Sequence, residues 1–160
     1  MKNILVLVAC ILAFMPSWTW AQNTEYNLNK NGVILEGYDP VSYFQSDSPK
    51  KGNPQIVVKR NQVSYWFSSD LNKQEFLKSP EKFEPQFGGW CAYAVADSKS
   101  KVEIDPLSFV IQDGRLLLFY PKSFIFGDTR EKWLHNKTKT ANTFLKEADA
   151  NWPAIKTKEP

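Results

Sequence analysis

Soft metal ligands are scarce in this chain. Its 160 residues include only 2 cysteines, 2 methionines and 1 histidine. Both methionines and Cys10 lie close to the N-terminus, so Cys91 and His135 are the only such groups in the rest of the sequence. A structural zinc site needs four nitrogen or sulfur ligands, and copper(I) prefers thiolate, thioether or imidazole. We therefore expect no metal site made by one chain, and we expect folding without metal.

A hydrophobic run long enough to cross a membrane is also missing. The best candidate, from Ile4 to Phe14, has about eleven residues, whereas a membrane span needs roughly 20. This run follows Lys2 and precedes Pro16 and a plausible peptidase site, which is the order typical of a secretory signal peptide. The sequence therefore predicts a signal peptide over residues 1–21 with cleavage before Gln22.

The predicted destination is the periplasm or the extracellular medium, with no stable membrane span after cleavage. Two alternatives stay open from the sequence alone. The apolar run could remain attached as an anchor. In addition, Leu7-Val8-Ala9-Cys10 resembles a lipoprotein box, which would place a lipid on Cys10.

A strong charge of either sign is absent. Lysine and arginine number 20 against 17 aspartates and glutamates, and loss of Lys2 with the signal peptide leaves 19 against 17. Nucleic-acid binding needs basic residues gathered on one face, but Lys50-Lys51 and Lys59-Arg60 are scattered among neutral and acidic residues. We therefore expect no nucleic-acid partner. Phosphate-binding glycine loops and nucleotide fingerprints are missing from the sequence as well, so no cofactor is identified.

What the sequence does contain is a series of short apolar runs separated by turn residues. Ile56–Val58 and Val63–Phe67 are rich in β-branched and aromatic residues and flank a polar turn, a pattern that predicts a hairpin. Asp113-Gly114 between two further apolar runs predicts a second hairpin.

Helix start signals follow each hairpin. Residues 68–70 supply N-cap oxygens for a helix of about ten residues. Pro80 suits the first position of a further short helix, and Asp128 with Glu131 resembles a capping arrangement. The expected fold class is α+β, in which short helices pack on a small antiparallel sheet of hairpins.

The last predicted helix runs from about residue 140 to residue 150 and is ended by Asn151-Trp152-Pro153. Since the length suits one domain with a real core, the expected organisation is a signal peptide over 1–21, an extended lead-in over 22–31, one domain over 32–153 and a loose tail over 154–160.

A weak internal echo runs through this order. Asp39-Pro40-Val41-Ser42-Tyr43 recurs as Asp105-Pro106-Leu107-Ser108-Phe109, and Phe76-Leu77 recurs as Trp133-Leu134. The two recurrences have unequal spacings along the chain, so a diverged duplication and a chance similarity both stay open. A real duplication would predict one sheet with strands from both halves.

Cys91 is the most informative residue. Once the signal peptide is removed it has no cysteine partner in the chain, so it cannot form an intramolecular disulfide. A lone thiol in an oxidising compartment is either well buried or kept for its chemistry. A helix beginning within residues 90–96 would favour the thiolate through its dipole.

The residues around Cys91 favour a binding site. Gly88 and Gly89 carry a conformational cost in regular structure, which indicates positive φ angles or a close backbone approach. Trp90 and Tyr93 flank the cysteine and could form an aromatic wall for a flat ligand. We therefore expect Cys91 to be partly accessible and to lie against these two rings, although aromatic residues beside a glycine pair also occur in ordinary cores.

A set of short motifs follows in order along the chain, namely Gly37–Phe44, Trp66–Ser69, Pro80–Pro85, Gly88–Ala94, Asp113–Leu116 and Ala148–Pro153. Together they resemble the exported YHS-domain proteins of bacteria. The resemblance covers residues 32–153, and the family has no settled activity. It is named after small domains that often bind metal through cysteines, and it includes selenoproteins. Selenocysteine at the position of Cys91 would imply reactivity there.

The chain departs from the metal-binding pattern of those relatives. Where they have cysteines, this sequence has Ser42, Ser68 and Asn72, which are poor ligands for zinc or copper(I). The resemblance therefore implies a YHS-like fold without the cysteine-rich metal site.

The sequence thus predicts an exported binding or accessory module centred on residues 88–94, with an unknown small ligand or a partner protein thiol. The alternative is a thiol-dependent redox enzyme in which Cys91 is the attacking group and a partner supplies the second thiol. Whether the protein is an enzyme stays open. The candidate ligand-binding residues are Gly88, Gly89, Trp90, Cys91 and Tyr93.

Overall fold

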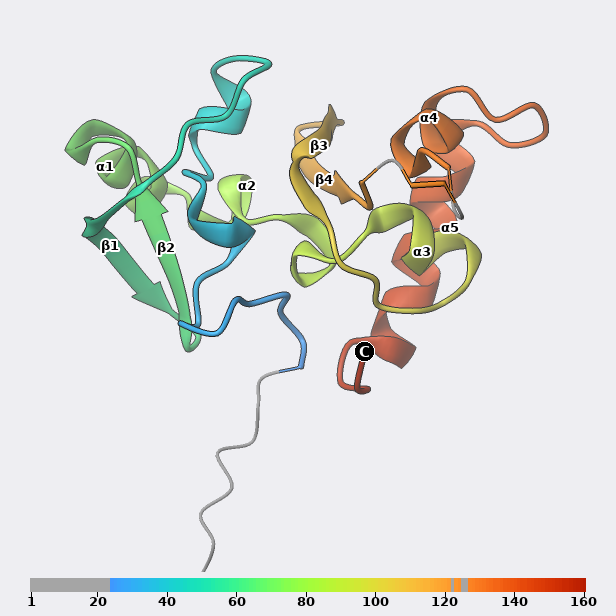
Figure 1. Ribbon diagram of the computed structural model, residues 1–160, viewed down its shortest axis with the longest axis horizontal. Helices are drawn as coiled ribbons and strands as arrows, with labels where there is room; N and C mark the ends of the chain where they lie inside the picture. Colours follow the sequence, from blue (N-terminus) through green and yellow to red (C-terminus); the bar gives the residue numbers. More distant parts are fainter. Residues whose placement is uncertain (1–23, 122, 125–126) are drawn as a thin grey trace, which may run out of the picture.

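The structure is a computed structural model that describes residues 24–121, 123–124 and 127–160. The predicted signal peptide, the cleavage point before Gln22 and the possible lipidation site at Cys10 lie outside the described residues. Figure 1 shows a first half with β1 (Asn53–Arg60), β2 (Val63–Phe67) and α1 (Asp70–Lys78) at one end. A second half with α3 (Ala92–Asp97), α4 (Thr129–Leu134) and α5 (Ala141–Ile155) lies at the other end. The hairpin of β3 and β4 lies between them.

The fold class is α+β, as expected, but the strands form two separate two-stranded antiparallel sheets. The elements in chain order are the 3-10 helices η1 (Leu35–Gly37) and η2 (Ser42–Phe44), the strands β1 (Asn53–Arg60) and β2 (Val63–Phe67), α1 (Asp70–Lys78), α2 (Pro80–Phe83), η3 (Gln86–Gly89), α3 (Ala92–Asp97), β3 (Asp105–Gln112), β4 (Arg115–Phe119), α4 (Thr129–Leu134) and α5 (Ala141–Ile155).

The helix caps and hairpin turns form where the sequence predicts them. The Ser69 side chain accepts a hydrogen bond from the amide of Asn72, and Asp128 does the same for Glu131. Asp113 and Gly114 both have positive φ at the β3–β4 turn, as a tight hairpin requires. These local predictions are confirmed.

The predicted end of the last helix is wrong. Helix α5 continues through Pro153 to Ile155, so residues 154 and 155 belong to the helix and not to a loose tail. Tertiary contacts outweigh the missing proline amide here. The Asn151 side chain donates to two carbonyls of α3, the Trp152 ring packs on Phe87, and Ile155 is buried.

Strand β4 joins two hydrophobic cores. Leu116 and Leu118 pack in the core of the first half, whereas Leu117 and Phe119 pack in the core of the second. Successive residues of a strand point to opposite faces, so one short strand contributes to both cores. The two halves are therefore packed as one unit.

The chain is built from two copies of one backbone motif. The β1–β2 pairing, with its irregularity between Asn53 and Val57, is repeated residue for residue by β3–β4, with the irregularity between Asp105 and Phe109. The parallel bridge from Val33 to Ser64 likewise recurs, at the same spacing, from Pro85 to Leu116. The same backbone motif therefore occurs twice, although each copy keeps its own sheet and the expected single sheet is wrong.

The predicted register of the duplication is also wrong. The structural partner of Asp105 is Asn53, and each accepts a backbone amide two residues on. The partner of Asp39 is instead Cys91. Their amides donate to the carbonyls of Lys50 and Val102, which are related by the same spacing along the chain. The shared Asp-Pro dipeptides suggest a false equivalence, because both aspartates accept the amide two residues on. Asp105 nevertheless begins strand β3, whereas Asp39 precedes the helical turn η2.

Candidate functional site

The backbone before Cys91 has the conformation that the glycine pair predicts. Gly88 and Gly89 have φ angles of +61° and +82°, in the region that glycine enters without steric cost. A Cβ atom on Gly88 would lie 2.0 Å from the carbonyl oxygen of Glu25. The backbone of Gly88 thus makes the close approach, and the partner is the polypeptide of the lead-in.

The Cys91 thiol is more enclosed than the sequence predicts. Its residue is 0% exposed, so the expectation of partial accessibility is wrong. The amide of Tyr120 donates to Sγ at 3.3 Å, and Sγ lies 3.7 Å from Thr129 Oγ1. The Thr129 hydroxyl in turn donates to the Tyr120 carbonyl at 3.0 Å. Cys91 therefore connects the start of α3 with the end of β4 and the start of α4.

A cavity of about 370 Å³ lies beside this thiol and is hereafter the Cys91 cavity. Its volume is in the range of small-molecule sites, and its surface is mostly apolar. The sulfur belongs to the wall but lies behind its surface, since Cys91 itself has no exposed area. The lining residues are Cys91, Tyr93, Ala94, Asp97, Ser98, Ser100, Val102, Tyr120, Thr129 and Lys132.

The Cys91 cavity has one side chain of each charge. Asp97 and Lys132 both line it, and the Lys132 ammonium lies 5.7 Å from the centre of the Tyr93 ring. Burial raises the pKa of the Tyr93 phenol, and the Asp97 carboxylate raises that pKa further. The phenol therefore stays neutral at physiological pH and can donate a hydrogen bond.

The structure divides the predicted site residues into two groups. Cys91 and Tyr93 line the cavity, whereas Trp90 faces the lead-in and donates from Nε1 to the Glu25 carbonyl at 3.2 Å. Gly88 and Gly89 face the lead-in too, since their carbonyls accept hydrogen bonds from Asn27. The glycine pair and Trp90 thus anchor the lead-in and do not contact the cavity.

Trp90 is covered by a buried lysine. The Lys101 ammonium lies 5.7 Å from the Trp90 ring centre and donates to the carbonyls of Thr24 and Lys158. Burial lowers the pKa of Lys101. This lysine therefore fastens both ends of the described chain beside the glycine pair.

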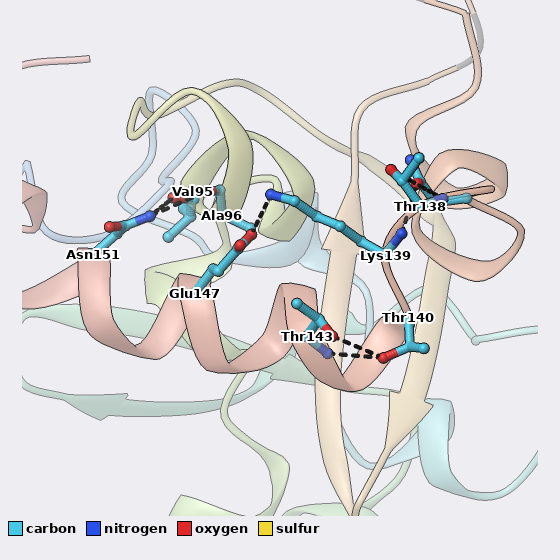
Figure 2. A network of polar contacts seen from close by, with 9 residues as sticks. Val95, Ala96, Thr138, Lys139, Thr140, Thr143, Glu147 and Asn151 are labelled. Carbon is cyan, nitrogen blue, oxygen red and sulfur yellow. Dashed lines mark hydrogen bonds and ion pairs between the residues drawn. The ribbon is translucent and has the colours of Figure 1, made fainter.

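Helix α5 holds the α3 wall of the cavity in place. Figure 2 shows Asn151 of α5 reaching the carbonyls of Val95 and Ala96, to which it donates at 3.1 and 3.0 Å. The same view shows Glu147 paired with Lys139, at 2.8 Å. Because α3 is short, the two Asn151 hydrogen bonds supply support that its own backbone cannot.

A second cavity, polar and about 340 Å³ in volume, lies between the two halves beside Gly88. Its charged groups are already paired within the protein. Arg115 bonds Asp149 at 2.6 Å, and Glu84 accepts from both Arg60 and Tyr65. This cavity therefore offers few polar groups to a ligand.

Several lining residues were missed by the sequence analysis. Thr129 and Lys132 belong to α4, which lies far along the chain from Cys91, and no local motif marks them. His135 caps the end of α4, is exposed and lies 3.7 Å from Glu131. Among the described residues, no group of three or more histidine, cysteine, aspartate or glutamate side chains is arranged to hold a metal ion.

No family model, curated protein or solved structure matches this chain. The resemblance to YHS-domain proteins therefore stays a prediction from the sequence. In the part of the chain that the structure describes, no helix combines the length and the apolar character that a membrane crossing requires.

Proposed function

We propose that this chain is an exported, YHS-like module that binds a small uncharged molecule in the Cys91 cavity. Export, to the periplasm or the medium, rests on the signal-peptide layout of residues 1–21. Binding rests on one observation above all, the mostly apolar cavity of about 370 Å³ at the cysteine.

The lining chemistry supports an uncharged, flat ligand. The opposite charges of Asp97 and Lys132 leave neither sign favoured at the cavity. The rings of Tyr93 and Tyr120 and the side chain of Val102 provide apolar surface. Aromatic rings pack well against other rings, and the hydroxyls of the lining tyrosines and serines suit one polar group on the ligand.

The contacts of Cys91 weigh against the alternative of a thiol-dependent redox enzyme. Disulfide exchange requires a thiolate that a partner sulfur can reach, whereas this sulfur is 0% exposed and accepts the Tyr120 amide. In our proposal Cys91 is a soft apolar group in the wall of a binding site and not a nucleophile.

Titration with p-cresol, which is uncharged at neutral pH, tests the binding proposal. We expect backbone amide shifts in NMR spectra at Tyr93, Val102 and Thr129. Ala94→Leu extends bulk into the cavity and should weaken binding about tenfold or more. Ala150→Leu adds the same bulk at an exposed position of α5 and should leave binding unchanged. Equal affinities of the two variants, or no shifts around the cavity, would contradict the proposal.

Alkylation separates the module from the redox enzyme. Folded protein is exposed to iodoacetamide, and modification is followed by intact mass. We expect Cys91 to react only after denaturant is added, since the reagent cannot reach a sulfur that is 0% exposed. The Cys91→Ser variant shows that modification requires this sulfur. Rapid modification of the folded protein would favour the redox alternative.

A further inference from the structure

The first half has a cavity at the place equivalent to the Cys91 cavity. It has a volume of about 320 Å³ and is hereafter the first-half cavity. Both cavities lie between the helical turn that follows Asp39 or Cys91 and the helix that follows the hairpin. The residues lining the first-half cavity are Val41, Phe44, Gln45, Leu71, Asn72, Glu75, Lys82 and Phe83.

Matching wall positions relate the two cavities. One wall of each cavity is the helical turn that follows Asp39 or Cys91. Equivalent residues of these two turns are separated along the chain by the same number of residues as equivalent residues of the two hairpins, which pairs Val41 with Tyr93 and Gln45 with Asp97. The loop after the second hairpin is longer, so along the helix wall the spacing is slightly larger. It pairs Asn72 with Thr129 and Glu75 with Lys132. The duplicated backbone therefore builds the same hollow twice.

The hydrogen bonds below the cavities are related in the same way. The Ser68 amide donates to Asp39 Oδ2 at 2.8 Å, and the Tyr120 amide donates to Cys91 Sγ at 3.3 Å. In the first half, Asn72 donates to Asp39 Oδ2 at 2.6 Å. At the equivalent place in the second half, Thr129 Oγ1 lies 3.7 Å from Cys91 Sγ. Each helix wall is therefore tied to its hairpin through one side chain of the preceding turn.

The first-half cavity has the chemistry of an aromatic site. Phe44 and Phe83 meet edge to face with centroids 5.3 Å apart, and Leu71 on the adjoining wall is 78% exposed. Glu75 and Lys82 carry opposite charges, so neither an anion nor a cation is favoured. An uncharged ring would cover this apolar surface. The side-chain nitrogen of Gln45 donates to Asn72 at 3.0 Å, so the Gln45 side-chain carbonyl would accept a hydrogen bond from the ligand's polar group.

We infer that the first-half cavity is a second binding site for an uncharged aromatic molecule carrying one hydroxyl or amide group. The chain then holds two ligands, one in each copy of the duplicated motif. This inference goes beyond the function proposed for the Cys91 cavity, because it concerns a different set of residues and can hold if that function fails.

The p-cresol titration reports on the two sites separately. Binding at the first-half cavity should shift the amides of Gln45, Leu71 and Glu75. Leu71→Lys removes an exposed apolar part of the wall. It should lower the p-cresol affinity measured from these shifts about tenfold or more, while the affinity measured from shifts around the Cys91 cavity is unchanged. Leu77→Lys is the matched control, since Leu77 lies on the same helix, is 48% exposed and does not line the cavity.

Each result decides the inference. Saturable shifts at the first-half residues that Leu71→Lys weakens and Leu77→Lys leaves unchanged support it, whether or not the Cys91 cavity also binds. Shifts confined to the Cys91 cavity would overturn it and leave the proposed function standing. First-half shifts of equal affinity in both variants would also overturn it, because binding would then not involve the cavity wall.

Discussion

At the scale of single residues, Asp39 and Cys91 occupy equivalent positions in the two copies of the backbone motif but lie in different environments. Asp39 Oδ2 accepts from the Ser68 amide and hydroxyl and from Asn72, at 2.6 to 2.8 Å. Hydrogen bonds to a carboxylate are strong, so this position can be buried while polar. The sulfur of Cys91 accepts one amide at a longer distance. A thiol behaves as a small apolar group with weak hydrogen bonds, which suits the wall of a mostly apolar cavity.

The glycine pair gives a prediction at this scale. Gly88→Ala should cost about 3 kcal/mol or more of unfolding free energy, because the new Cβ would meet the Glu25 carbonyl at 2.0 Å in addition to the strain of positive φ. Gly32→Ala is the matched control, because its φ is +70° but nothing lies within 4 Å, and it should cost only about 1 kcal/mol.

Urea unfolding of the unsubstituted protein and of the two variants checks these expected losses of unfolding free energy. Similar losses from Gly88→Ala and Gly32→Ala would show that the φ angle alone matters and that the contact with the lead-in does not.

At the scale of elements, the sequence predicts what local chemistry determines. The two hairpins, the caps at Ser69 and Asp128 and the helix that begins at Pro80 all follow from residues within a few positions of one another. The end of α5 does not. Proline disfavours continuation of a helix, but Asn151 and Ile155 make contacts with distant segments that no local pattern reveals.

The candidate site is also only partly predictable from local sequence. Cys91 and Tyr93 are predictable, since a cysteine without a partner in the predicted mature chain and an adjacent ring stand out in the sequence. Thr129 and Lys132 are ordinary polar residues of a short helix, and only the folded chain brings them to the cavity. The repeat is similarly hard to see in the sequence, because equivalent positions such as Asp39 and Cys91 keep the same backbone hydrogen bond but have unlike side chains.

At the scale of the whole molecule, the shared strand β4 couples the two halves. Leu116 and Leu117 are adjacent and both 0% exposed, but they face the cores of the first and second half respectively. Loss of either core would leave one face of β4 exposed to water, and exposed apolar area costs about 25 cal/mol per Å². The halves should therefore unfold together.

This coupling is tested by Leu116→Ala and Leu117→Ala. Each should lower the unfolding free energy by about 2 to 5 kcal/mol, as expected for a buried leucine. In urea titrations followed by NMR, amide signals from both halves should disappear at one common midpoint, which moves down by a similar amount in either variant. Separate midpoints, with Leu116→Ala moving only first-half signals and Leu117→Ala only second-half signals, would show that the copies are independent domains despite the shared strand.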